Sequence, residues 1–369
     1  MHIQPSPETY EIAAGEVGRD FAATLRQMRA SAPGEQQRRI AQLMEPETGD
    51  YTDETVWTLK GAVAPGAFTA DGRLKTMDHM GVARALIMSD PLVMATSFAE
   101  GEVALRTMRH WNRFILDYIR HDPDRLRAAA LLNTHDVGEA IAEAQAMVKA
   151  GCRAFAISSS VPPGKASPAH DAMDPLWRLL EEADAAILLH AGGEAGFLAS
   201  YDWAKGVEHL SFRPTDIASE CEQINIYTFS TLPYAAQNFL TTLILGGVFE
   251  RFPRLRLGMA ELGAGWLGPL AERLDQIATI YHRRLSPVLS LKPSDYIARG
   301  VRVSPYRFEP VADYVERFGL GQCYCYSSDF PHPEGGTAPL REYAGHIERL
   351  GGDYAEQFFI HNGAWLLPA

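Results

Sequence analysis

The stretch Tyr326-Ser327-Ser328-Asp329-Phe330-Pro331-His332 carries the pattern that decides the fold. A short β-prone run ends in Asp329, and a loop rich in Pro and Gly follows it and carries His332. In barrel enzymes the catalytic side chains gather where the strands end, at their C-terminal tips. Asp329 and His332 are therefore candidate metal ligands. The alternative is an Asp that caps a turn, next to a surface histidine.

Two other apolar runs end in a side chain that can bind a metal. One run ends in His190 and the other in Glu261, and glycines follow both. Glycines allow a ligand to approach the backbone closely. A charged group at the end of a buried strand must be paired or bound to a metal. Taken singly, each residue has a structural explanation, but three such strand ends in one barrel favour a shared metal or acid–base site.

Apolar strand candidates alternate with helical patterns, which predicts a parallel sheet covered by helices. The candidates span residues 83–88, 126–132, 152–158, 186–190, 255–261, 301–304 and 323–329. Residues 1–3 supply an eighth, which would complete a (β/α)8 TIM barrel. We expect a single metal-dependent domain over residues 1–369. It would carry an N-terminal helical insertion at 11–68 and a long, aromatic-rich insertion at 192–233 after the fifth strand.

The composition argues against several functional classes. A net charge of −12 and a pI of about 5.5 disfavour a nucleic-acid surface. We find neither an apolar run of membrane-spanning length nor a signal peptide, so we expect a cytoplasmic protein without a membrane partner. Four scattered cysteines do not suggest a disulfide framework. Cys323 and Cys325 are read as small core residues rather than metal ligands.

With these residues the chain resembles the amidohydrolase superfamily, in the branch related to aminocarboxymuconate-semialdehyde decarboxylase. The resemblance covers about residues 70–365. It includes the segments Arg73–Val82, Asp122–Leu126 and Gly247–Pro253, which are similar to the branch's first long helix and to the approaches to its third and sixth strands.

The resemblance implies a metal held by a His-x-His pair after strand one, a histidine on each of strands five and six, and an Asp on strand eight. His190 and Asp329 match two of these positions, and His2 matches the second member of the pair. Glu261 stands where a histidine is expected, and His332 is an additional nitrogen donor. The implied metal ligands are thus His2, His190, Glu261, Asp329 and His332, with Asp329 and Glu261 also as catalytic residues.

Glu261 and His332 give the ligand set a mixture of carboxylates and imidazoles, and a carboxylate can bridge two metals about 3.5–4 Å apart. That variant resembles barrel-fold non-haem diiron monooxygenases of bacterial diterpenoid biosynthesis, which act on acyl-CoA substrates. The resemblance implies two iron ions, hydroxylation of a hydrophobic and possibly CoA-linked small molecule, and a ferredoxin or reductase as electron donor. The alternative is a hydrolase or a non-oxidative decarboxylase that contains one zinc or manganese ion.

Three further residues are candidates for substrate binding. Ser158 ends the fourth strand, Glu194 lies in the loop after His190, and Arg302 lies on the seventh strand, where it could pair with a carboxylate. Turn chemistry explains Ser158 equally well, and a solvated loop position explains Glu194. Aromatic residues in the 192–233 insertion suggest a sizeable apolar pocket. A homo-oligomer is expected, and its order is left open.

Overall fold

The structure of the protein is a computed structural model. It describes residues 1–31, 44–160, 162–194, 196–198, 203–210 and 226–367, together with 34, 37 and 41. The chain forms two compact units. The first contains Met1–Leu131, Ala199–Ser230 and Ser328–Pro339, and the second contains Leu132–Leu198, Thr231–Ser327 and Leu340–Ala369. The prediction of one domain over residues 1–369 stays a prediction.

The first unit begins with a strand position, as the sequence predicts. His2 forms a parallel bridge with Met88, directly after β1 (Ala85–Ile87). The N–H of Met88 donates to the carbonyl of Met1 at 2.8 Å, and the N–H of Ile3 donates to that of Met88 at 3.1 Å. On its other side β1 pairs in parallel with β2 (Leu126–Leu132). The N-terminal residues are therefore the first of the parallel strand segments.

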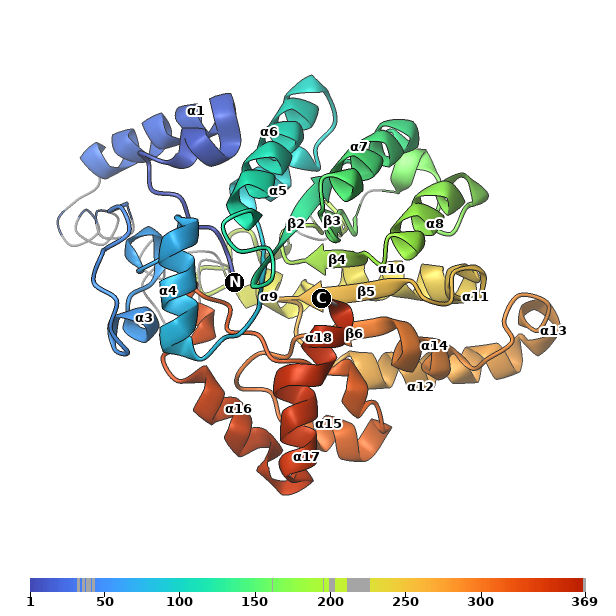
Figure 1. The fold of residues 1–369 in the computed structure, drawn as a ribbon. Helices are drawn as coiled ribbons and strands as arrows, with labels where there is room; N and C mark the ends of the chain where they lie inside the picture. Colours follow the sequence, from blue (N-terminus) through green and yellow to red (C-terminus); the bar gives the residue numbers. More distant parts are fainter. Residues whose placement is uncertain are drawn as a thin grey trace. The chain divides into compact units, whose positions relative to one another are not determined.

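Helices of the first unit follow the sequence pattern. They are α1 (Tyr10–Ser31), α3 (Thr55–Thr58), α4 (Ala70–Met80), α5 (Pro91–Ser97), α6 (Glu102–Ile119) and α9 (Ile226–Thr231) (Figure 1). α6 buries Ala104, Met108, Trp111 and Ile115, which recur every three or four residues and so form one apolar face. The insertion expected at 11–68 is helical or irregular in its described part.

The second unit contains four parallel strands. β3 (Ala154–Ile157), β4 (Ala186–His190), β5 (Arg256–Ala260) and β6 (Val301–Val303) pair in this order. Every residue of β4 is buried, as expected of a parallel strand with both faces covered. The helices of this unit are α7 (Val137–Lys149), α8 (Asp174–Glu182), α10 (Pro233–Leu245), α11 (Val248–Arg251), α12 (Leu267–Ile280), α13 (His282–Leu285), α14 (Pro293–Gly300), α15 (Val311–Phe318), α16 (Pro339–Ile347), α17 (Gly352–Glu356) and α18 (Asn362–Leu366).

The strand expected over 323–329 is wrong in its extent. Gly321–Cys323 forms a 3-10 turn, and the only ladder contacts in the described part of this segment are a bridge between Val303 and Tyr324 and the 3.0 Å hydrogen bond from Cys325 N–H to the Val303 carbonyl. The Asn362 amide donates to the carbonyls of Gly321 (3.1 Å) and Tyr324 (2.7 Å). A side chain thus takes carbonyls that a longer strand would pair.

With the bridges at His2 and Tyr324, the described chain contains eight parallel strand positions that alternate with helices. This is the α/β fold of the TIM-barrel type, as the sequence predicts. Within the described residues, no helix combines the length and apolarity that a membrane span requires. Cys152, Cys323 and Cys325 are buried and form no disulfide among the described residues, in line with a role as core residues. Cys221 and the insertion residues Tyr201 and Phe212 lie outside the described residues.

Candidate metal centre

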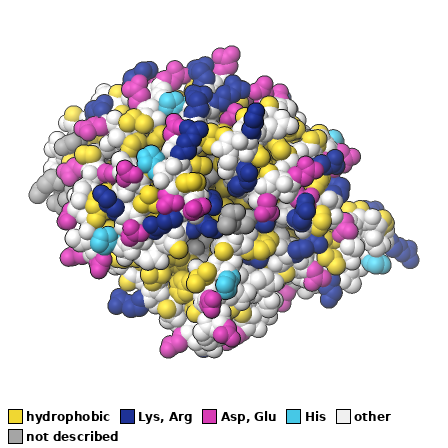
Figure 2. Space-filling view, in the orientation of Figure 1, with side chains coloured by type: hydrophobic (Ala, Val, Ile, Leu, Met, Phe, Trp, Pro, Cys, Tyr) yellow, Lys and Arg dark blue, Asp and Glu magenta, His cyan; other side chains and the backbone are white. Residues whose placement is uncertain are grey.

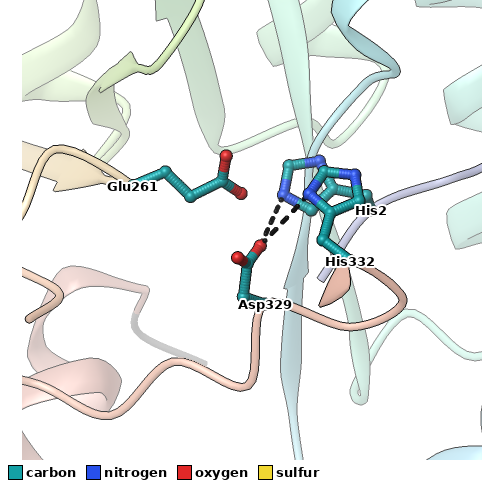
Figure 3. A group of neighbouring side chains, drawn as sticks. All are labelled: His2, Glu261, Asp329 and His332. Atoms are coloured by element: carbon teal, nitrogen blue, oxygen red, sulfur yellow. Dashed lines mark ion pairs between the residues drawn. The ribbon is translucent and has the colours of Figure 1, made fainter. Parts of the chain in front are cut away.

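Three of the predicted ligands meet within the first unit. Asp329 Oδ1 lies 3.3 Å from His2 Nε2 and 3.4 Å from His332 Nδ1, and Figure 3 marks both contacts. The two imidazoles stack with ring centroids 4.0 Å apart. One ligand atom from each residue lies within 4.8 Å of the others. Residues at the two ends of the sequence thus form one group, which we call the His2–Asp329–His332 cluster.

The backbone fixes the His2 ring in a form that suits a metal ligand. His2 Nδ1 lies 3.3 Å from the Ser89 carbonyl oxygen. A carbonyl only accepts, so Nδ1 carries the proton and, in the neutral ring, Nε2 presents a lone pair to the Asp329 carboxylate. Two acceptors that face each other need a proton or a cation between them. A ligating histidine usually donates its other N–H to a carbonyl or carboxylate in this way.

Asp329 is buried in a strained backbone conformation. Its φ is +50°, in the left-handed region that few residues other than glycine adopt. The residue is 8% exposed, and neither carboxylate oxygen accepts a hydrogen bond from any residue that the structure describes. A buried carboxylate is costly unless an opposite charge compensates it. The cluster therefore fits a bound cation.

Packing holds Asp329 in place. Phe330 is fully buried in an apolar cluster with Val56, Ala64, Ala67 and Met80. The Phe330 carbonyl also accepts the His2 N–H at 2.7 Å, and the His332 N–H donates to the Asp329 carbonyl at 2.8 Å. The ligand-bearing turn is therefore fixed to the first strand position and to the core.

A second imidazole–carboxylate pair forms within the second unit. His190 Nε2, at the end of β4, lies 3.1 Å from Glu261 Oε1. His190 Nδ1 lies 2.7 Å from the Ala191 carbonyl, so it also carries its proton on Nδ1 and directs Nε2 toward the carboxylate. Glu261 follows β5 and has φ +56°. The pair repeats two features of the His2–Asp329–His332 cluster, a backbone-fixed imidazole and a left-handed carboxylate residue.

A third carboxylate holds the loop that carries Glu261. Glu309 accepts the backbone N–H groups of Ala264 (3.0 Å), Gly265 (2.9 Å) and Tyr306 (2.6 Å). The Tyr306 hydroxyl donates to the Glu261 carbonyl at 2.7 Å. We call Glu309 and Tyr306 the Glu309 clamp. Neither residue is predicted from the sequence, because a carboxylate that binds distant backbone groups leaves no local pattern.

Two predicted substrate residues lie near His190. The Ser158 hydroxyl donates to the Gly193 carbonyl at 2.9 Å, which ties the end of β3 to the loop after β4. Glu194 is half-buried, and desolvation raises the pKa of its carboxyl. Two nearby charges have smaller effects on this pKa: His190 lowers it and Glu261 raises it. Glu194 thus lies in the electrostatic surroundings of the His190–Glu261 pair. Substrate binding by either residue stays a prediction.

Arg302 has partners of its own in the second unit. Its guanidinium lies 3.7 Å from the centre of the Trp365 ring and donates to the carbonyls of Val301 (2.8 Å) and Ala298 (3.3 Å). Burial lowers its pKa. These contacts give Arg302 a packing role, and its pairing with a substrate carboxylate stays a prediction without further support.

Asp90, a buried residue in the first unit, is also not predicted from the sequence. Its carboxylate accepts from the Tyr10 hydroxyl (2.9 Å), the Gln4 amide (3.1 Å) and the Leu92 N–H (2.8 Å). Desolvation raises the pKa of Asp90, although these hydrogen bonds oppose the shift. Asp90 directly follows Ser89, whose carbonyl orients the His2 ring. The hydrogen bonds of Asp90 therefore help to hold the His2–Asp329–His332 cluster in place. The available signal was local, an Asp directly before Pro91 at the start of a helix.

The side chains of the His2–Asp329–His332 cluster can bind several metals. Two imidazoles and a carboxylate bind zinc in hydrolases and iron(II) in oxygenases, and carboxylates also suit manganese. Such an ion polarises a bound oxygen atom or orients a substrate carboxylate.

Comparison with known proteins gives consistent matches. A family model described as "Amidohydrolase" matches residues 56–366. An amidohydrolase from Mycobacterium avium has a similar structure, with 18% identity, 81% of this chain and 74% of that chain covered, and a TM-score of 0.65. A 2,6-dihydroxybenzoate decarboxylase from Rhizobium is 16% identical, with 93% of this chain and 94% of that chain covered and a TM-score of 0.62. A 5-carboxyvanillate decarboxylase from Novosphingobium aromaticivorans, complexed with manganese, is 16% identical, with 98% of this chain and 92% of that chain covered and a TM-score of 0.63. No curated protein sequence matches.

Proposed function

The chain belongs to the amidohydrolase family, a family of metal-dependent enzymes, and we propose that it is a non-oxidative decarboxylase of a carboxylate-bearing, largely apolar substrate. The observation that carries the proposal is the buried Asp329 carboxylate, which faces two imidazoles and accepts no hydrogen bond from the described residues. A cation there would compensate the carboxylate and attract a substrate carboxylate. Two of the structural relatives reported above are decarboxylases.

One manganese or zinc ion is the metal we propose, in place of the two iron ions expected from the sequence. His2 and Asp329 would hold it, and it would supply a positive charge that orients the substrate carboxylate. The manganese in the Novosphingobium enzyme supports this choice. That His190 and Glu261 also bind this ion is a prediction from the family resemblance.

The reaction then needs a proton. The bond between the substrate carbon and its carboxyl group breaks, carbon dioxide leaves, and the electron pair stays on the carbon. That carbon must be protonated by an acid within hydrogen-bond reach. We assign this proton to His332, which in this proposal acts as the acid in place of the metal-ligand role expected from the sequence. Its Nδ1 lies 3.4 Å from Asp329 Oδ1.

An anaerobic assay tests the proposal. The purified protein is analysed for metals and incubated without oxygen with 2,6-dihydroxybenzoate, 5-carboxyvanillate and related carboxylated phenols in D2O. We expect about one manganese or zinc per chain, release of carbon dioxide, and one deuterium at the vacated carbon. His332→Asn should lower kcat more than metal content, whereas His361→Asn, at an exposed histidine paired with Glu356, should change neither.

Other results would select another function. Two irons per chain with oxygen uptake and a need for a reductase would overturn the proposal in favour of the monooxygenase, which none of the relatives reported above supports. Ester, amide or lactone cleavage without carbon dioxide release would identify a hydrolase.

A further inference from the structure

Arg73 is a charged residue in the interior of the first unit. Figure 2 shows Lys and Arg side chains at the surface, interspersed with acidic ones, which is the usual place for a charge. Arg73, on α4, is instead 0% exposed. Among the described residues, its hydrogen-bond acceptors are all backbone carbonyls. A buried charge is costly unless it is paired or hydrogen-bonded, so these carbonyls decide what Arg73 contributes.

The carbonyls belong to the first strand position and to the loop before α4. Arg73 Nη2 donates to the carbonyl of His2 and, at 3.1 Å, to that of Ala67. Its Nε donates to the Gly66 carbonyl at 2.8 Å. A guanidinium is flat and presents its donors in a rigid fork, so these bonds fix the carbonyls relative to one another. His2 is thereby held against the loop before α4.

The same guanidinium contacts the turn that carries Asp329. Its central carbon lies 5.0 Å from the centre of the Phe330 ring, within the range of a cation–π contact. Phe330 directly follows Asp329, and its carbonyl accepts the His2 N–H. Arg73 therefore contacts His2 and the neighbour of Asp329, the two residues whose side chains lie 3.3 Å apart in the His2–Asp329–His332 cluster.

The loop before α4 is bound to the same two segments. The Ala67 carbonyl, which Arg73 binds, also accepts the N–H of Gln4 at 2.9 Å. At the other end of this loop, the Gly61 N–H donates to the Pro331 carbonyl at 2.9 Å. Arg73 is thus the side chain at which the loop, the first strand position and the ligand-bearing turn meet.

We propose that Arg73 is a positioning residue of the metal centre, which fixes His2 relative to Asp329. It acts through the backbone of His2 and the ring of Phe330, and it does not itself bind the metal or the substrate. Its effect on metal affinity rests on the ion proposed above for His2 and Asp329. Its effect on the backbone of these two segments does not.

Arg73→Met and Arg73→Lys test this role. Met keeps an apolar stem without donors, and Lys keeps the charge without the fork. Arg299→Met is the matched control in the second unit. The Arg299 guanidinium also donates to a backbone carbonyl, that of Phe249, and lies 5.2 Å from the centre of the Tyr296 ring, and neither residue adjoins a candidate ligand.

Titration with manganese, followed by electron paramagnetic resonance, gives the first measurement. Arg73→Met should lower the affinity at least tenfold, as is typical when a residue that orients a ligand is lost. Arg73→Lys should recover part of this loss, and Arg299→Met should remain within twofold of the wild type. Equal affinity in the wild type and Arg73→Met would overturn the proposal.

Hydrogen exchange of the metal-free protein, measured by mass spectrometry, gives the second. Arg73→Met should raise exchange at least tenfold in peptides that cover residues 1–5 and 328–332, with little change in β4 and β5. If Arg73→Met does not fold, Arg73→Lys should show a smaller rise in the same peptides. A uniform rise along the chain would show that Arg73 only stabilises the fold, which would overturn the proposal. The local rise in a protein that binds no manganese or zinc would support the positioning role and refute the proposed function.

Discussion

Asp329 and Glu261 occupy similar places and are held by different means. Each follows a strand position, has a positive φ and lies close to an imidazole whose Nδ1 faces a backbone carbonyl. Asp329 is fixed by apolar packing, because its neighbour Phe330 is part of the core of the first unit. Glu261 is fixed by the Glu309 clamp, which is polar and half-buried. The position of Asp329 should therefore depend on global stability, and that of Glu261 on a few hydrogen bonds.

Loss of the Asp329 charge should have the largest effect. Asp329→Asn should lower metal affinity by more than the ten- to hundredfold typical of residues that only support a ligand. The metal-free variant should be as stable as the wild type or more stable, because it no longer buries a carboxylate. Metal titration and thermal unfolding measure both effects. Asp313→Asn, at an exposed carboxylate, should leave both unchanged, and a metal-free variant that is clearly less stable would contradict this account.

Truncation of Phe330 tests packing as the support of Asp329. Phe330→Ala should lower the free energy of unfolding by about 3–5 kcal/mol, the usual cost of removing a buried aromatic ring. Metal affinity should fall with it, because the turn loses its anchor. Chemical denaturation and metal titration on the same preparation test the link. Unchanged metal affinity in the destabilised protein would show that packing does not position Asp329.

Disruption of the Glu309 clamp should lower metal affinity with a smaller loss of stability than truncation of Phe330. Glu309→Gln replaces hydrogen bonds to a charged acceptor by weaker ones, which should cost about 1–2 kcal/mol of stability. If Glu261 is a ligand, metal affinity should fall about tenfold. Glu316→Gln, at an exposed residue paired with Arg349, is the control. Equal metal affinity in both variants would separate Glu261 from the metal.

Removal of one hydroxyl gives the smallest effect. Tyr306→Phe deletes the 2.7 Å hydrogen bond to the Glu261 carbonyl and leaves the Glu309 contacts. We expect a loss of about 1 kcal/mol or less and a change in metal affinity of a few fold. Chemical denaturation of the wild type and the variant measures the loss of stability, and metal titration measures the change in metal affinity. An effect larger than that of Glu309→Gln would reverse the order of importance within the clamp.

The sequence predicted what depends on local pattern. Apolar runs that end in His190 and Glu261 mark buried strands whose last side chain needs a partner. β4 ends at His190, and β5 ends directly before Glu261. The extent of the eighth strand is overestimated, because the Asn362 side chain binds the carbonyl of Tyr324 and that of Gly321 just before the strand. The periodicity of hydrophobic residues and the turn residues do not predict a hydrogen bond of this kind.

The same limit explains the missed supporting residues. Glu309 binds backbone groups about 45 positions away, and Asp90 binds a hydroxyl 80 positions away. Either contact can be made by a carboxylate anywhere on the chain, so only the fold identifies it. The side chains at the strand ends were therefore predictable, whereas the residues that hold them were not.

The left-handed backbone at positions 261 and 329 also restricts which sequences an engineer could place there. Among residues other than glycine, Asn, Asp and His adopt this region most readily, and β-branched residues adopt it with difficulty. A saturation library at either position should therefore return mostly small polar or imidazole side chains. These are also side chains that bind metals, so directed evolution could exchange the ligands, for example by Glu261→His, while the backbone stays the same.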